Sequence, residues 1–181
     1  LSLYPGHQHS EDALQAIARI FRANDLYAEA ASAYSRLMED YPNGDKTSQA
    51  YLEAAGCREL LGEWKAAAEL YELYLKKFPS YPGAKDAQRK LAAVRKVIHH
   101  AGLLADALPS GKKASALYEM GQIVYKELGS PQKAVGIFAE VADQFPKSYQ
   151  GPDARFSQGA CQLREEAFEA AREVFERLIK D

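Results

Sequence analysis

The chain has 181 residues, of which 47% are hydrophobic, and a formal net charge of -2 at neutral pH. This length and apolar content suffice for one folded unit with a buried core. The near-zero charge, with both signs mixed, disfavours a nucleic-acid-binding protein, which usually carries a basic stripe. No apolar run approaches the roughly 18 residues that a membrane-spanning helix needs, so we expect no direct membrane span.

A short pattern recurs along the chain at a fixed spacing. Aromatic–proline dipeptides that begin at Tyr4, Tyr41 and Phe78 lie 37 residues apart. Another begins at Phe145, 67 residues after Phe78. An alanine followed four residues later by an aromatic side chain has the same period, in the pairs Ala30 and Tyr34, Ala67 and Tyr71, Ala134 and Phe138, and Ala171 and Phe175. A fixed period of this length predicts a repeat solenoid.

Each period predicts two antiparallel helices. In the second period, small and apolar residues recur at helical spacing over residues 46–62 and again over 64–77. Gly62 separates the two helices, and Pro79 ends the second because the residue before a proline is pushed out of the helical region. We therefore expect an all-α, right-handed superhelical solenoid of antiparallel helix pairs, in one domain over residues 1–181. Its repeats are expected at about residues 9–42, 46–79, 83–109, 112–146 and 151–181.

The middle repeat, 83–109, is degenerate. Residues 83–99 fit a first helix, but positions 104 and 108 carry Leu104 and Leu108 where the alanine and the aromatic residue are due. A Pro-Ser-Gly break follows at residues 109–111. We expect a short or fused second helix here and a kink at 109–112, with a plain loop as the alternative.

The spacing of alanine, aromatic residue and proline resembles the tetratricopeptide repeat. Gly121 and Gly159 lie near the glycine expected on that family's first helix, whereas its tryptophan is absent. The resemblance implies a helix-pair solenoid that binds other proteins on an extended face.

The joints between repeats carry a narrower resemblance. The segments 78–91 and 145–154 are similar to joints of bacterial cell-envelope tetratricopeptide proteins. These include the periplasmic partner of the Tol–Pal system and the lipoprotein of the outer-membrane barrel-assembly machine. The likeness implies an envelope assembly in the periplasm, and the cytoplasm is the alternative location.

The first helices of such a solenoid line its concave surface, so their unpacked positions are the candidate protein-binding residues. These are Gln15, Arg19, Arg22, Gln49, Leu52, Glu59, Glu119, Ile123, Lys126, Ser157 and Arg164. The surface is mixed, with a slight basic excess at its two ends, and suits a peptide or helix with polar anchors. The alternative is that these side chains form an ordinary solvated helix face.

No motif indicates catalysis, a metal or a cofactor. A zinc site needs three or four converging ligands, and neither His7 with His9 nor the pair His99 and His100 has further ligands at suitable spacing. Cys57 and Cys161 fall at core positions of expected helices, which predicts buried free thiols. We expect a protein that is not an enzyme and binds no cofactor.

The sequence therefore predicts a non-catalytic protein-interaction scaffold that binds a protein or peptide. Residue 1 is Leu and the pattern is cut at residue 181, so we expect a fragment of a longer chain. Val174, Phe175, Leu178 and Ile179 would then be partly bare. The alternative function is a structural spacer or self-association module, which forms a homo-oligomer through exposed solenoid ends. An enzyme or metal protein is the least favoured interpretation.

Overall fold

The structure, a computed structural model, describes residues 9–105 and 108–180, and these ranges contain helices and no strands. The helices are α1 (Ser10–Ala23), α2 (Tyr27–Asp40), α3 (Thr47–Leu61), α4 (Trp64–Lys77), α5 (Ala84–Ala105), α6 (Ser110–Lys126), α7 (Pro131–Gln144), α8 (Gly151–Arg164) and α9 (Phe168–Lys180). None of them is long and apolar enough to cross a bilayer. The all-α prediction is confirmed.

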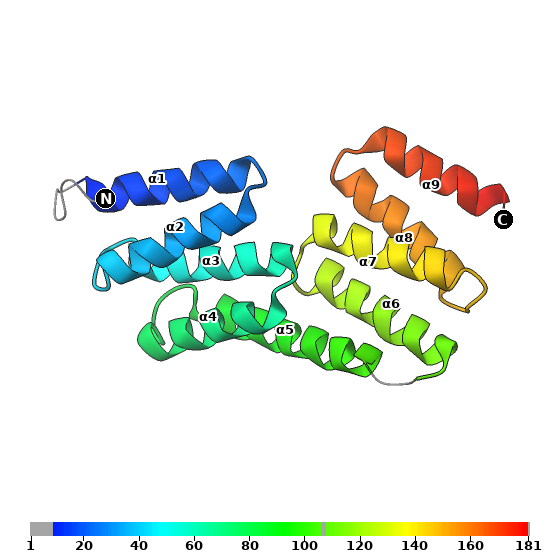
Figure 1. Cartoon of the computed structure of the whole chain (residues 1–181), viewed down its shortest axis with the longest axis horizontal. Coiled ribbons are helices and arrows are strands. Elements are labelled where there is room, and N and C mark those ends of the chain that lie inside the picture. The colour runs from blue at the N-terminus through cyan, green and yellow to red at the C-terminus, as the bar shows by residue number, and fades with distance from the viewer. Residues whose placement is uncertain (1–8, 106–107, 181) are drawn as a thin grey trace. The chain divides into compact units, whose positions relative to one another are not determined.

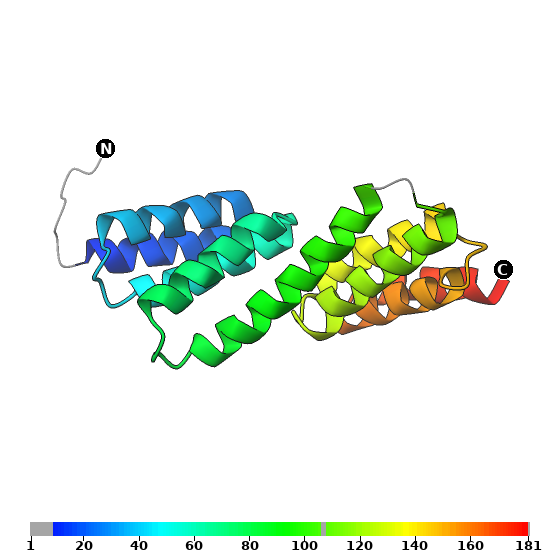
Figure 2. The ribbon, with the colours of Figure 1, turned by 90° about the horizontal axis from the view of Figure 1, so that it is seen from below.

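The chain divides into two compact units, the first ending at Leu91 and the second beginning at Ala92. In the first unit α1 packs on α2, α2 on α3 and α3 on α4. In the second, α6, α7, α8 and α9 pack in the same sequential way (Figure 1). Figures 1 and 2 show that consecutive helices within each unit run in opposite directions, so each unit is a stack of antiparallel helix pairs.

The aromatic–proline joints end α2, α4 and α7 with one geometry. Tyr41, Phe78 and Phe145 follow these helices with φ between -130° and -128°. In each case the backbone N–H donates to the carbonyl oxygen four residues earlier, at 2.7 to 3.0 Å. The following proline has no N–H and cannot extend the helix, so the chain turns back at an equivalent point in each repeat. Tyr4 and Pro5 lie outside the described residues.

The turn inside each helix pair places one residue in the left-handed backbone region. The residues are Asp25 (φ 58°), Gly62 (φ 79°), Gly129 (φ 67°) and Glu166 (φ 59°), all at equivalent positions of the repeat. In three of these four turns, the N–H of the residue that follows the left-handed one donates back to the preceding helix: Leu26 to Phe21, Glu63 to Arg58, and Ala167 to Gln162. This six-to-one bond is the Schellman cap of a helix.

The recurring alanine and aromatic residue form the core. The four alanines are fully buried, as are Tyr34, Tyr71 and Phe138. Two of the recurring aromatic rings, Phe138 and Phe175, pack on the first-helix glycines Gly121 and Gly159. A Cβ on Gly121 would lie 2.7 Å from Cε1 of Phe138, so only a glycine fits there without movement of the ring.

The middle of the chain, where a degenerate repeat with a short or fused second helix was expected, contains one long helix. Leu104 lies within α5, which runs without interruption from Ala84 to Ala105. The next helix starts at Ser110, after Pro109 as its N-cap. Residues 106 and 107 lie outside the described residues. The repeat boundaries and the kink at 109–112 stay predictions.

Candidate protein-binding faces of the first helices

In the first unit, polar side chains join the two first helices, α1 and α3. Gln15 Nε2 donates to Gln49 Oε1 at 3.2 Å. About two turns further along α1, the Arg22 guanidinium forms an ion pair and hydrogen bond with the Glu53 carboxylate. Arg19, between these contacts in the sequence, is exposed and makes no ion pair with the described residues. The result is a polar face on which the Arg19 guanidinium has no ion-pair partner among the described residues.

In the second unit, α6 and α8 are joined in a comparable way. Gln122 Nε2 donates to the Tyr118 hydroxyl at 2.9 Å and to Ser157 Oγ at 3.5 Å. Arg164 Cζ lies 5.5 Å from the centroid of the Tyr125 ring. A guanidinium over an aromatic face is attracted by the ring's negative quadrupole, so this contact orients the charged group.

The second half of α5 adds contacts to α6. His100 Nε2 lies 3.5 Å from Glu119 Oε2, and Lys96 Nζ lies 2.8 and 2.9 Å from the two carboxylate oxygens of Glu127. Lys126 is exposed and has no ion-pair partner in the described ranges. In the second unit, Lys126 is therefore an exposed cation without an ion-pair partner on the same helix as these ordered polar groups.

Two residues that the sequence placed on the binding face are buried, and that part of the prediction is wrong. Glu59 is only 4% exposed and Ile123 only 8%. The Glu59 carboxylate accepts a 2.7 Å hydrogen bond from the Tyr71 hydroxyl. Burial raises the pKa of Glu59, and the nearby Lys90 opposes this shift. Both residues belong to the packing of their units, not to a binding surface.

The remaining expected residues are exposed or half-buried, and the structure brings several of them together with partners that sequence reasoning missed. These partners are Glu53, Tyr118, Gln122, Tyr125 and His100. Glu53 follows its partner by 31 residues and Gln122 precedes Ser157 by 35. Complementary polar residues nearly one period apart are the signal that would have found them. Leu52 is half-buried near Gly83.

The described residues contain no group of three or more His, Cys, Asp or Glu side chains that could hold a metal ion. Cys57 and Cys161 are buried free thiols, as the sequence predicted. Burial raises the pKa of each thiol to about 11, and the reactive form of cysteine is the thiolate. His7 lies outside the described residues.

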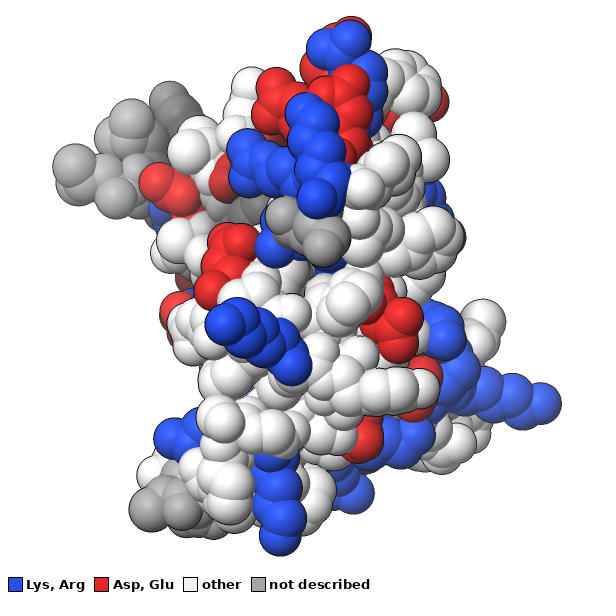
Figure 3. Space-filling view, turned by 90° about the vertical axis from the view of Figure 1, so that its right-hand side faces the viewer, with Lys and Arg blue, Asp and Glu red and all other residues white. Residues whose placement is uncertain are grey.

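Charges of both signs are interspersed on the face of the molecule that Figure 3 shows. Blue and red side chains lie against one another at the top and at the lower right of this view, with uncharged areas elsewhere, and no single-sign field covers this face. A mixed surface favours recognition through a few placed polar contacts over long-range attraction to a highly charged partner.

Stacked antiparallel helix pairs with polar first-helix faces define the class of α-helical repeat proteins. The sequence model of the tetratricopeptide repeat family matches residues 11–82 and 123–181, so the chain belongs to this family. Its repeats generally mediate protein–protein interaction and are generally not catalytic. The chain is therefore a protein-interaction repeat scaffold.

Several solved structures are similar to the chain, each at 16% sequence identity. The alignment with the TPR-like repeats of a putative kinesin light chain from Podosopora anserina covers 96% of this chain and 96% of that one, with a TM-score of 0.42. MamA protein covers 96% of this chain and 92% of its own, with a TM-score of 0.44. BtubC from P. vanneervenii covers 93% and 78%, with a TM-score of 0.41. A comparison with curated proteins gave no match.

Proposed function

We propose that the chain binds a peptide or helix of a protein partner on the faces of its first helices, as a non-catalytic scaffold. One observation carries this proposal. On the first-helix faces, Arg19 in the first unit and Lys126 in the second are exposed cations without an ion-pair partner among the described residues. Each cation accompanies polar side chains that neighbouring first helices hold in place.

The chemistry of these faces favours a partner segment with acidic side chains. A guanidinium offers paired donors that match a carboxylate, and charge-assisted hydrogen bonds are stronger than neutral ones. The contact between Gln15 and Gln49 and the stacking of Arg164 on Tyr125 restrict these side chains before a ligand arrives. Groups that are already ordered lose less conformational entropy on binding.

We place this scaffold in a bacterial envelope assembly, in the periplasm, with the cytoplasm as the alternative. The support is the likeness of the joints at 78–91 and 145–154 to those of envelope tetratricopeptide proteins. Fractionation of cells that carry the tagged protein, with markers for both compartments, tests the location. Recovery of the tagged protein with the cytoplasmic marker alone contradicts the periplasmic location.

Affinity capture from a bacterial lysate, followed by quantitative mass spectrometry, tests the binding faces. The baits are the wild type, the double variant Arg19→Glu/Lys126→Glu, and the control Lys65→Glu/Lys147→Glu. The control makes the same change in charge at exposed positions outside the first helices. We expect a partner that the wild type and the control retain and the first variant loses.

The affinity of the recovered partner is then measured for the three baits. The Arg19→Glu/Lys126→Glu variant should bind the partner at least about tenfold more weakly than the wild type does, because each hydrogen bond to a charged group contributes about 1.5–3 kcal/mol. Equal affinity for all three baits moves the interface away from the first-helix faces and contradicts the proposal.

A second role, as a structural spacer or self-association module, is favoured by a separate observation. Large apolar side chains are exposed on α1 and α9, including Ile17, Ile20 and Ile179. Apolar residues on the outermost helices of a repeat stack are suited to packing against a further repeat.

A further inference from the structure

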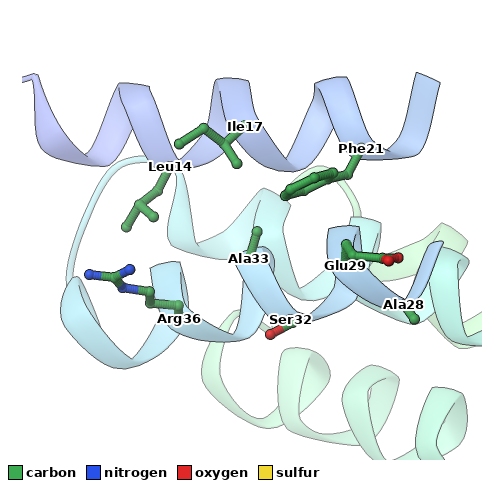
Figure 4. A pocket seen from close by; sticks show the side chains of 8 residues that line it. All are labelled: Leu14, Ile17, Phe21, Ala28, Glu29, Ser32, Ala33 and Arg36. Carbon is green, nitrogen blue, oxygen red and sulfur yellow. The ribbon is translucent and has the colours of Figure 1, made fainter. Parts of the chain in front are cut away.

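The outer side of the first helix pair has an open apolar groove of about 580 Å³. Its lining residues are Leu14, Ile17, Phe21, Ala28, Glu29, Ser32, Ala33 and Arg36. Figure 4 shows that the three α1 side chains project toward α2, while Glu29 and Arg36 come from α2. Ile17 is 44% exposed and Ile20, on the same helix, 61%. The groove is therefore apolar in its floor and bounded by two opposite charges.

The repeat itself shows what covers such a groove. One period after Ile17 and Ile20 come Ala54 and Cys57 of α3, which are fully buried in a cluster with residues of α2. Leu70, one period after Ala33, also packs against this cluster. In the interior of the stack, the surface equivalent to the groove is thus covered by the second helix of the preceding pair.

The opposite half of that interface is exposed on α9. Phe175 and Leu178 are half-buried and Ile179 is 84% exposed. The equivalent residues are Tyr34, Leu37 and Met38 in α2, and Phe138, Val141 and Ala142 in α7. All of these except the partly buried Met38 are at most 1% exposed. The apolar face of α9 is therefore the face that α2 and α7 place against a following first helix.

We propose that the chain associates head to tail, with α9 of one copy packed on α1 and in the groove between α1 and α2 of a second copy. One chain carries both halves of the interface that joins consecutive pairs inside the stack: the first-helix half on α1 and the second-helix half on α9. The residues of each half occupy the same positions of the repeat as in the interior. Packing of α9 on α1 of a second copy continues the α2-on-α3 contact from one molecule to the next. This inference rests on the self-association role proposed above and is independent of peptide binding by the first-helix faces.

The contact is heterologous because two different surfaces meet. A heterologous contact leaves one free surface of each kind after every addition, so it produces rings or open chains and not a closed dimer. This property separates the proposal from a symmetric contact between two α9 helices or two α1 helices.

One residue of α9 departs from the interior pattern. Arg172 occupies the position of Ala31, Ala68 and Val135 in the other second helices. It forms ion pairs with Glu169 at 2.7 Å and with Glu176 at 3.9 Å. A charged side chain at the edge of an apolar contact has to lose water on association. The Arg172→Ala variant should therefore associate more tightly than the wild type.

Sedimentation velocity tests the interface with residues 1–181, over about a hundredfold range of protein concentration. Ile17→Asp disables the α1 surface and keeps α9 intact, whereas Ile179→Asp does the reverse. We expect the wild type to form larger species as the concentration rises. Each variant alone should associate at least about tenfold more weakly, because burial of an unpaired charge is strongly unfavourable.

The mixture of the two variants is the decisive sample. Ile17→Asp supplies an intact α9 and Ile179→Asp an intact α1 surface, so together they should form a one-to-one dimer and nothing larger. Recovery of association in the mixture also shows that both variants are folded. The control Leu73→Asp adds a charge at an apolar residue of the same exposure, 44%, on α4, and should behave as the wild type.

A wild type that stays monomeric over the whole range overturns the proposal and the self-association role together, and leaves peptide binding untouched. Association that persists in either variant alone indicates a symmetric or unrelated contact, and overturns the α9-on-α1 interface only. A mixture that associates no better than its components also overturns it.

Discussion

The Tyr71 hydroxyl donates a 2.7 Å hydrogen bond to the Glu59 carboxylate inside the first unit, where both side chains are buried. Tyr71 is the recurring aromatic residue of its repeat, and Glu59 projects from the preceding first helix. Loss of water raises the pKa of Glu59, while Lys90 and the hydrogen bond from Tyr71 lower it in part. Burial, together with the charge of Glu59, raises the pKa of Tyr71.

Glu59→Gln should stabilise the protein at neutral pH and reduce its dependence on pH. Because the folded state binds the Glu59 proton more tightly than the unfolded chain does, this group's contribution to stability is greatest at low pH and is lost as pH rises through its folded-state pKa. Glutamine keeps an acceptor for Tyr71 and does not ionise. We expect a gain of about 1–2 kcal/mol near pH 7 and little difference near pH 4.

Urea unfolding of both proteins at the two pH values measures this effect. The difference between wild type and variant isolates Glu59, since the other titrating groups are shared. A variant that is less stable than the wild type near neutral pH would show that the ionised carboxylate is stabilising, and would contradict the prediction.

Gly121→Ala should destabilise the second unit. The added Cβ would lie 2.7 Å from Cε1 of the fully buried Phe138, and overpacking of a core typically costs about 1–3 kcal/mol. Gly136→Ala is the matched control, because a Cβ there meets nothing within 4 Å. Its effect should be a gain of up to about 1 kcal/mol from helix propensity alone. Thermal unfolding of the two variants measures whether each change raises or lowers stability. Equal changes in stability for Gly121→Ala and Gly136→Ala would refute the close packing of Gly121 on Phe138.

Glu166→Gly should stabilise the turn between α8 and α9. Glu166 has a φ of 59°, a region that is unfavourable for a residue with a Cβ. Glycine already occupies the equivalent positions 62 and 129. We expect a gain of about 0.5–1 kcal/mol, reduced from the full strain by the greater freedom of glycine in the unfolded chain.

The reverse substitution, Gly62→Ala, should lose about 1 kcal/mol for the same reason. Denaturant unfolding measures both changes. If Glu166→Gly and Gly62→Ala shift stability in the same direction, the left-handed conformation is not the cause.

Cys57 and Cys161 should resist thiol reagents in the folded protein. Both are fully buried, and burial raises the pKa of each thiol to about 11, so the thiolate is scarce at neutral pH. Labelling with a chromogenic disulfide near pH 7.5 should be slow without denaturant and should reach both thiols rapidly in urea. Fast labelling of either thiol in the native state would show that its helix opens locally.

The sequence predicted the repeat architecture because its strongest constraints are local and periodic. A buried alanine with an aromatic residue one turn later, such as Ala134 and Phe138, must face the core in every repeat. A proline such as Pro79 ends a helix through its own geometry. These features do not depend on contacts between distant residues, and their repetition made the pattern clear.

The binding faces were predicted less completely because they depend on distances between helices. Arg22 and Gln49 were assigned to the first-helix surface, but the pairing of Arg22 with Glu53 requires the separation of α1 and α3. Glu59 was misplaced because a carboxylate is normally exposed, and the hydrogen bond from Tyr71 that accompanies its burial is not visible in the spacing. Sequence periodicity gives the direction of a side chain more reliably than its partner.

Helix α5 also bears on the order in which the protein folds. It begins in the first unit and ends in the second, without a break between Leu91 and Ala92. Extending an existing helix is far easier than starting a new one, so formation of either unit supplies the other with a nucleus. The two units should therefore fold and unfold in a single cooperative transition, although each has a core of its own.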